Sequence, residues 1–299
     1  MKKIATILLL FLIHVSCNTT KTSLSTTTKN RSIDLLHIKN LSNDITETSG
    51  LEFYKNLMIT HNDSGDLPTL YFLNERGEIL KRKTYTNMSN VDWEDITKDE
   101  EFLYIADIGN NYGNRRDLVI YKIRLNDLDN ENARVEKLMI NYPNQKSFKN
   151  GNQNHPYDAE SLVAIDNDLY VFSKDWKDQA TIIYKIDKNK TQQSADEITS
   201  YNVKGLITGA TYNGTDTVML CGYNSNLEPF IVLIDYKNGK FHFHEKINIP
   251  IENGAQVEAI TFLKNRKNQQ IYYISCEAVN IKLGEDEAKT AAQLYQLRY

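Results

Sequence analysis

The chain has 299 residues, a formal net charge of −4 at pH 7 and 40% hydrophobic residues, enough for a sizeable folded core. Acidic residues outnumber basic ones and no dense basic stripe offsets them, which excludes nucleic acid as a partner. The chain contains three cysteines, too few for a disulfide-dense scaffold.

The N-terminus carries an export pattern. Two lysines precede an apolar run over residues 4–15, which is too short to span a membrane as a helix. The six residues that end at Cys17 read Leu-Ile-His-Val-Ser-Cys and resemble the lipobox of bacterial lipoproteins. We predict a lipoprotein signal peptide over residues 1–16 and a diacylated Cys17 that anchors the chain to a membrane. The alternative is an ordinary signal peptide that is cut nearby.

A polar segment follows the predicted lipid. Residues 17–31 consist mainly of Thr, Ser, Lys and Asn, cannot bury a core and predict a flexible tether. We therefore expect a location in the bacterial cell envelope, facing the periplasm or the cell surface. No acidic sorting signal follows Cys17, which favours the periplasm. The remaining residues, 32–299, suit one large all-β domain.

Strand-like runs repeat five times along this domain, and no helical periodicity persists between them. The first strands open at Ser49, Glu94, Glu160, Thr208 and Glu258. The second strands begin at Leu57, Leu103, Leu169, Val218 and Ile271. The third strands cover residues 70–73, 119–123, 182–186, 231–234 and 293–297, and outer strands cover 78–85, 135–142, 197–203 and 240–249. The intervals between the openings are 45, 66, 48 and 50 residues, a period typical of β-propeller blades.

The two ends of the domain complement each other. The last repeat has three strands and ends at Tyr299, whereas residues 32–38 form a strand-like run without a repeat of their own. A propeller closed by its N-terminal strand leaves no unpaired edge in the final blade. We therefore predict an all-β, five-bladed β-propeller, with a six-bladed propeller or a double-sheet sandwich as alternatives. Cys221 and Cys276 fall on neighbouring blades, as two buried thiols or as a disulfide.

The repeat also predicts what lies at the centre, because the first strand of each blade lines the central channel. It gathers five polar residues around the axis: Ser49, Glu94, Glu160, Thr208 and Glu258. Two residues earlier come Glu47, Asp92, Asp158 and Gln256. Ionised glutamates about 4 Å apart repel by roughly 4 kcal/mol per pair, so a cation among them is expected. Oxygen ligands in a wide ring favour Ca²⁺ over Mg²⁺. The alternative is a water-filled channel in which these side chains cap backbone groups.

The loops between second and third strands should surround the same end of the channel. They supply three candidate catalytic bases, Asp63, Asp107 and Glu277. They also supply candidate ligand-binding residues, namely Lys174, Arg115, Trp176 and Tyr223. Cations beside aromatic rings suit a polar small molecule, a glycan or a partner protein.

The order of blade-opening residues (Ser, Glu, Glu, hydroxyl, Glu) resembles that of calcium-activated nucleotidases of the apyrase type. This resemblance implies a five-bladed propeller with a central Ca²⁺ on the five opening residues, and hydrolysis of nucleoside di- and triphosphates. The chain departs from that family in two loops. Residues 62–65 read Asn-Asp-Ser-Gly without the family's arginine, and residues 173–175 read Ser-Lys-Asp in place of paired arginines.

Three further segments are similar to uncharacterised secreted propellers, some of which are grouped with phytase-like esterase domains. These segments are residues 92–96, 106–111 and 158–162, which read Asp-Trp-Glu-Asp-Ile, Ala-Asp-Ile-Gly-Asn-Asn and Asp-Ala-Glu-Ser-Leu. A shared propeller fold does not define a substrate, because propellers host many unrelated functions.

Two functions are consistent with these patterns. One is a non-catalytic, membrane-tethered propeller with a central Ca²⁺ and a ligand- or partner-binding face. The other is a Ca²⁺-dependent hydrolase of a phosphorylated substrate, in which the cation polarises a phosphoryl oxygen and orients water. No complete catalytic constellation is present in the sequence, which favours the first.

Overall fold

The computed structural model describes residues 33–299 except 131, 252–253, 268 and 284–285. The predicted signal peptide, the lipidated Cys17 and the tether lie outside the described residues. Within the described residues the chain is almost entirely β-strand, with one 3-10 turn, η1 (Leu125–Asp127). None of the helical structure described is long and apolar enough to cross a membrane.

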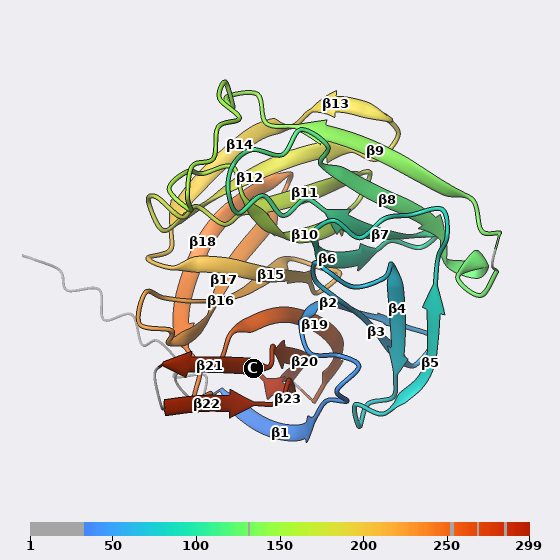
Figure 1. Cartoon of the computed structure of the whole chain (residues 1–299), viewed down its shortest axis with the longest axis vertical. Helices are drawn as coiled ribbons and strands as arrows, with labels where there is room; N and C mark the ends of the chain where they lie inside the picture. The colour runs from blue at the N-terminus through green and yellow to red at the C-terminus, as the bar shows by residue number, and fades with distance from the viewer. Residues whose placement is uncertain (1–32, 131, 252–253, 268, 284–285) are drawn as a thin grey trace, which may run out of the picture. The chain divides into compact units, whose positions relative to one another are not determined.

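Most strands of the described residues form five blades of four antiparallel strands each, which follow one another along the chain (Figure 1). Blade 1 contains β2 (Thr48–Tyr54), β3 (Leu57–Asn62), β4 (Thr69–Leu73) and β5 (Ile79–Thr84). Blade 2 contains β6 (Trp93–Lys98), β7 (Phe102–Asp107), β8 (Val119–Arg124) and β9 (Val135–Asn141). Blade 3 contains β10 (Ala159–Ile165), β11 (Asp168–Ser173), β12 (Ala180–Asp187) and β14 (Asp196–Asn202). Blade 4 contains β15 (Leu206–Tyr212), β16 (Thr217–Tyr223), β17 (Pro229–Lys237) and β18 (Lys240–Asn248).

Blade 5 is completed by the beginning of the domain. Its first three strands are β19 (Val257–Arg266), β20 (Gln269–Cys276) and β23 (Gln293–Arg298), and its outer strand is β1 (Asp34–Asn40). The β1 and β23 strands are antiparallel, with Asp34 opposite Arg298 and Asn40 opposite Gln293. The predicted five-bladed propeller and its closure by the N-terminal strand are therefore confirmed.

Two short elements are added to the five four-stranded blades. The strand β13 (Gln192–Ser194), which belongs to the connection between two strands of blade 3, pairs in parallel with β9 and covers the outer edge of blade 2. A separate hairpin, β21 (Val279–Leu283) and β22 (Asp286–Thr290), leaves blade 5 between β20 and β23. Covering the blade 2 edge removes unpaired backbone groups from solvent.

The innermost strands contact one another in a closed series, β2–β6–β10–β15–β19 and back to β2. Five apolar clusters of buried residues each lie between two neighbouring blades. The inner strands are accordingly buried over most of their length, whereas the outer strands are largely exposed. Polar bridges add to them. Asp95 Oδ2 in blade 2 accepts a 2.8 Å bond from Leu162 N in blade 3, and Thr211 Oγ1 in blade 4 accepts one from Phe262 N in blade 5.

The two cysteines in the described residues, Cys221 and Cys276, are free and buried in the cluster between blades 4 and 5. The expectation of two buried thiols is met. Burial raises the pKa of both thiols, which leaves them protonated and unreactive at neutral pH.

Candidate functional site

A β-bulge near the start of each inner strand defines the end of the channel that holds the candidate site. In blades 2, 3, 4 and 5 the residues skipped by the strand pairing are, respectively, Glu94, Glu160, Thr208 and Glu258. In blade 1 the skipped residue is Gly50, one position after Ser49. A bulge re-aims a side chain out of the ladder, so four blades present a side chain at this position and blade 1 presents none.

The two hydroxyl residues of the predicted ring are bonded to neighbouring backbone. Ser49 Oγ donates to the carbonyl of Glu94, and Thr208 Oγ1 donates to the carbonyl of Val257. Both bonds cross from one blade to the next, and both side chains are buried. The two hydroxyls therefore link neighbouring blades. Such bonds to backbone groups are what the alternative hypothesis, a channel without a cation, expects of these side chains.

On the blade 3 side of the ring, a lysine side chain supplies a positive charge. Lys174 follows β11, is 5% exposed, and its Nζ forms a buried ion pair with Glu160 Oε1. Burial raises the pKa of Glu258 well above its ordinary value, and the Lys174 charge opposes that rise. Lys174 Nζ lies 4.8 Å from the ring centroid of Trp176 and 5.7 Å from that of Tyr223. Lys174, which was predicted to bind an external ligand, thus pairs with Glu160 and offsets part of the Glu258 charge from within the protein.

The blade 1–2 side has acids without such a lysine. Asp63, Asp92 and Glu94 each offer a carboxylate oxygen, and these three oxygens lie within 4.8 Å of one another. Glu94 is 3% exposed, and its Oε1 is buried without a hydrogen-bond partner. An unsatisfied buried carboxylate oxygen costs free energy unless a cation or a proton occupies the space beside it.

Gly109, in the loop after β7, makes room for this cluster. A Cβ at position 109 would lie 2.0 Å from Glu94 Oε1 and 2.4 Å from Asp92 Oδ2. Any side chain there would displace both carboxylates. The glycine of the Asp-Ile-Gly-Asn-Asn segment is therefore required by the close approach of two acids to its backbone.

The three acids resist simultaneous ionisation. Burial, with the charges of Asp63 and Asp158, raises the pKa of Asp92 to about 8, and burial raises that of Asp63 to about 6. Burial and the charges of Asp63 and Glu160 raise the pKa of Glu94 well above its ordinary value. A divalent cation would favour the ionised forms of all three.

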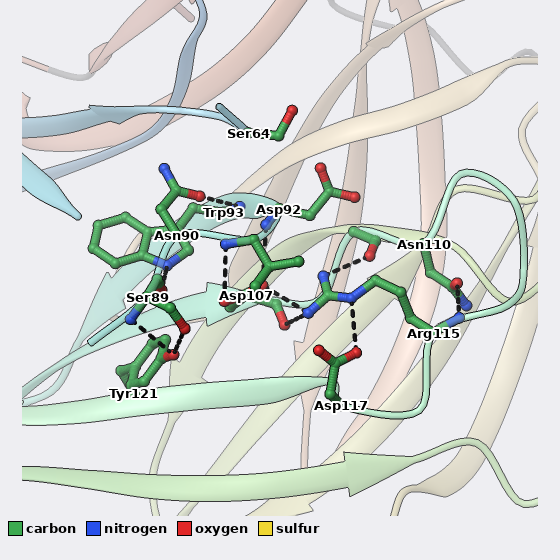
Figure 2. A network of polar contacts seen from close by, with 12 residues as sticks. Ser64, Ser89, Asn90, Asp92, Trp93, Asp107, Asn110, Arg115, Asp117 and Tyr121 are labelled. Atoms are coloured by element: carbon green, nitrogen blue, oxygen red, sulfur yellow. Dashed lines mark hydrogen bonds and ion pairs between the residues drawn. The ribbon is translucent and has the colours of Figure 1, made fainter. Parts of the chain in front are cut away.

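A network around Arg115 positions Asp92 (Figure 2). Asp107 accepts hydrogen bonds from Asp92 N (3.1 Å) and Val91 N (3.3 Å) and pairs with Arg115 Nη2 at 2.8 Å. Arg115 Nη1 also donates to the Gly109 carbonyl (2.8 Å), and its Nε donates to Asp117 (3.2 Å). The Asp92 side chain points away from this ion pair, toward the side where Ser64 lies. Asp107 and Arg115 thus hold the loop in shape.

The remaining candidates lie around the same centre. Trp176 Nε1 donates to Asp158 Oδ2 at 2.7 Å, while Asp158 Oδ1 accepts from Asn110 N at 2.6 Å. Glu277 lies after β20, and its N donates to the Gln256 carbonyl. Burial and the charges of Asp63 and Glu160 raise the pKa of Glu277 to about 8. The structure brings these side chains together in one acidic centre.

A cavity of about 380 Å³ adjoins one of the three acids, Asp92. Asp92 belongs to its wall, along with residues from three loops: Ser64, Asn110, Asn111, Tyr112, Asn114, Arg115 and Gln153. The sequence placed Asp92 beside the ring but not among the metal ligands, and Gly109 and Gln153 are site residues that were not candidates on sequence grounds. The Asp-x-Glu spacing across the start of β6 is a signal for Asp92, whereas Gln153 comes from an insertion with no counterpart in the other repeats.

No family model and no curated protein matches the chain. Among solved structures, the PQQ-bound form of aldose sugar dehydrogenase (Adh) from Streptomyces coelicolor aligns at 8% identity over 89% of this chain and 98% of its own, with a TM-score of 0.48.

AztD from Citrobacter koseri aligns at 11% identity over 81% of this chain and 61% of its own, with a TM-score of 0.39. Its apo form aligns at 11% identity over 78% and 57%, with a TM-score of 0.36. This chain thus spans less than two thirds of the length of AztD. Likeness at this level carries no functional argument, and the five blades follow from the strand pairing itself.

Proposed function

We propose that this protein is a membrane-tethered propeller lipoprotein of the bacterial cell envelope that binds Ca²⁺ and, around it, a polar ligand. Asp63, Asp92 and Glu94 are the proposed protein ligands of the cation. The observation that carries the proposal is the buried Glu94 Oε1, which has no hydrogen-bond partner and faces two further carboxylates. Elsewhere in the ring, Lys174 already compensates Glu160.

The chemistry of the three ligands supports Ca²⁺. All are carboxylates, and hard cations prefer oxygen donors. Oxygens spread within 4.8 Å suit the longer and more flexible coordination of Ca²⁺ better than the tight octahedron of Mg²⁺. Three carboxylates supply only part of the roughly six to eight ligands that Ca²⁺ takes, so water or a bound ligand would complete the shell.

A binding role is better supported than hydrolysis of a phosphorylated substrate. The resemblance to calcium-activated nucleotidases agrees with a cation in this region, but Asp63, a candidate base, is assigned to that cation. A phosphoryl group also needs cationic side chains that are free to bind it. Arg115 is engaged by Asp107, Asp117 and Gly109, and Lys174 is engaged by Glu160.

Calcium binding is tested by calorimetric titration and thermal melting of the wild type and Glu94→Gln in EDTA, Mg²⁺ or Ca²⁺. At a hundredfold excess over the dissociation constant, Ca²⁺ should stabilise the wild type by about 2.7 kcal/mol, and Glu94→Gln should lose the effect. Glu75→Gln, which alters an exposed acid, is the matched control and should behave as wild type. Equal shifts in wild type and Glu94→Gln, or no Ca²⁺-selective shift, would contradict the proposal.

The tether is tested separately by metabolic labelling with a clickable fatty acid during bacterial expression. The wild type should incorporate the label and partition with membranes, whereas Cys17→Ser should do neither. A wild-type chain released in soluble form without label would instead support an ordinary signal peptide.

A further inference from the structure

The cavity beside Asp92 is formed by segments that are far apart in the sequence. Ser64 comes from the loop after β3, Asn111 and Tyr112 come from the loop after β7, and Gln153 comes from the 143–157 insertion that joins β9 to β10. Asp92 belongs to both the cavity wall and the proposed cation site. A cation bound there would face the cavity.

The insertion is held firmly against the loop after β7. Gly151 N donates to the Tyr112 carbonyl (2.7 Å), and His155 Nε2 lies 3.0 Å from the Asn111 carbonyl. Because His155 Nδ1 accepts from Tyr157 N (3.1 Å), the ring proton sits on Nε2 and donates to Asn111. A Cβ at Gly113 or Gly151 would lie 2.8 Å from the His155 ring, so the two walls pack closely.

Gln153 is presented at this wall by a strained backbone. Asn152 and Gln153 are consecutive residues with φ of 47° and 57°, in the left-handed region that residues other than glycine rarely adopt. The strain is supported by the Asn150 side chain, which accepts from Asn152 N at 2.9 Å, and by the docked Gly151. Such strain persists where surrounding contacts impose it, and it is concentrated at ligand sites.

The lining is rich in groups that both donate and accept hydrogen bonds. Four amides (Asn110, Asn111, Asn114 and Gln153) and Ser64 line the cavity, and Tyr112 is 52% exposed. Arg115 is the one basic residue among the described lining residues, and its guanidinium is bonded to protein acceptors. The neighbouring carboxylates add negative charge. This combination disfavours a polyanion and suits a neutral polyhydroxylated molecule with an apolar face for the tyrosine.

We propose that this cavity binds a saccharide, whose vicinal hydroxyls complete the coordination of the Ca²⁺ held by Asp63, Asp92 and Glu94. The proposal rests on the proposed calcium site and adds its ligand class. The amides of Gln153, Asn111 and Asn114 hydrogen-bond the remaining hydroxyls, and Tyr112 packs against the C–H face of the sugar ring. Because hydroxyl oxygens ligate Ca²⁺ as water does, the cation is required for binding and the protein side chains add to the affinity.

The test is calorimetric titration of the full chain in detergent, loaded with Ca²⁺ or treated with EDTA. The probes are the methyl glycosides of mannose, galactose, fucose and glucose, compared with inorganic phosphate and ATP. At least one glycoside should bind with a dissociation constant of about 1 mM, and EDTA should abolish the binding. Gln153→Ala and Tyr112→Ala should each weaken it about tenfold while leaving the Ca²⁺ affinity unchanged. Gln192→Ala, which removes an exposed glutamine on β13, is the matched control.

The outcomes separate this inference from the calcium proposal. Ca²⁺ binding without binding of any glycoside overturns the saccharide inference and leaves the calcium site standing. Phosphate or ATP binding more tightly than every glycoside also overturns it, in favour of the hydrolase alternative. Glycoside binding that survives EDTA or is unaffected by Gln153→Ala places the sugar elsewhere and overturns the inference. A wild type that binds no Ca²⁺ overturns both proposals.

Discussion

Glu94 in blade 2 and Glu160 in blade 3 occupy the same bulged position of adjacent inner strands, and they are 3% and 4% exposed. Glu160 is paired with Lys174, whereas one oxygen of Glu94 has no hydrogen-bond partner and faces Asp63 and Asp92. The repeat sets the direction in which each glutamate points. The loop behind it determines whether the protein supplies the counter-charge, and this difference separates a structural ion pair from a proposed cation site.

The largest expected effect comes from removing the internal counter-charge. Lys174→Met leaves Glu160 and Glu258 buried without their ammonium group and should lower the free energy of unfolding by about 3–5 kcal/mol. Urea denaturation measures this loss. Lys177→Met, at an exposed position of the same loop, should change stability by less than about 0.5 kcal/mol. Similar values for the two variants would mean that Lys174 does not stabilise the ring.

Gly109→Ala tests the proposed cation site, on the blade 1–2 side of the ring. Its Cβ would overlap Glu94 Oε1 and Asp92 Oδ2, so the variant should lose the Ca²⁺-dependent stabilisation of about 2.7 kcal/mol at a hundredfold excess. Calcium titration followed by thermal melting tests this, and circular dichroism checks the fold. Gly214→Ala, at a positive φ with no atom near the added Cβ, is the control and should lose some stability but retain the response. A retained response in Gly109→Ala would argue for a cation elsewhere.

In calcium-free protein, the two glutamates should respond to amide substitution with opposite signs. Glu160→Gln weakens the ion pair to Lys174 and should destabilise by about 1–3 kcal/mol. Glu94→Gln removes a carboxyl group crowded by like charges and should stabilise by roughly 1 kcal/mol. Urea denaturation in EDTA compares them. Effects of the same sign would mean that their environments do not differ as described.

The smallest effects concern the hydroxyls. Ser49→Ala and Thr208→Ala each remove one hydrogen bond between blades and should cost about 1 kcal/mol while leaving the Ca²⁺ affinity unchanged. Calorimetric calcium titration of both variants distinguishes a site on the blade 1–2 side from the full five-membered ring expected from the sequence. A large fall in affinity would favour the full ring.

The strand order could be predicted because each blade repeats the same pattern of apolar residues. The closure could be predicted because the last repeat lacks one strand and the start of the domain has one strand to spare. The centre was harder to predict. Aligning blade 1 on a hydroxyl selected Ser49, whereas the pairing skips Gly50, since a bulge leaves no distinct mark in residue type. As basic residues in loops near the channel, Arg115 and Lys174 were predicted to bind a ligand. In the structure, Arg115 donates hydrogen bonds to Gly109 and Asp107, and Lys174 donates one to Glu160.

The pairing of β1 with β23 joins residues near opposite ends of the domain, from Asp34 to Arg298. The β1 strand has no partner in blade 5 until β23, which lies near the other end of the domain, has been made, so the ring cannot close before then. Contacts of such high sequence separation slow folding. In the exported lipoprotein proposed above, this late closure would keep the chain unfolded enough to cross a membrane until β23 has followed.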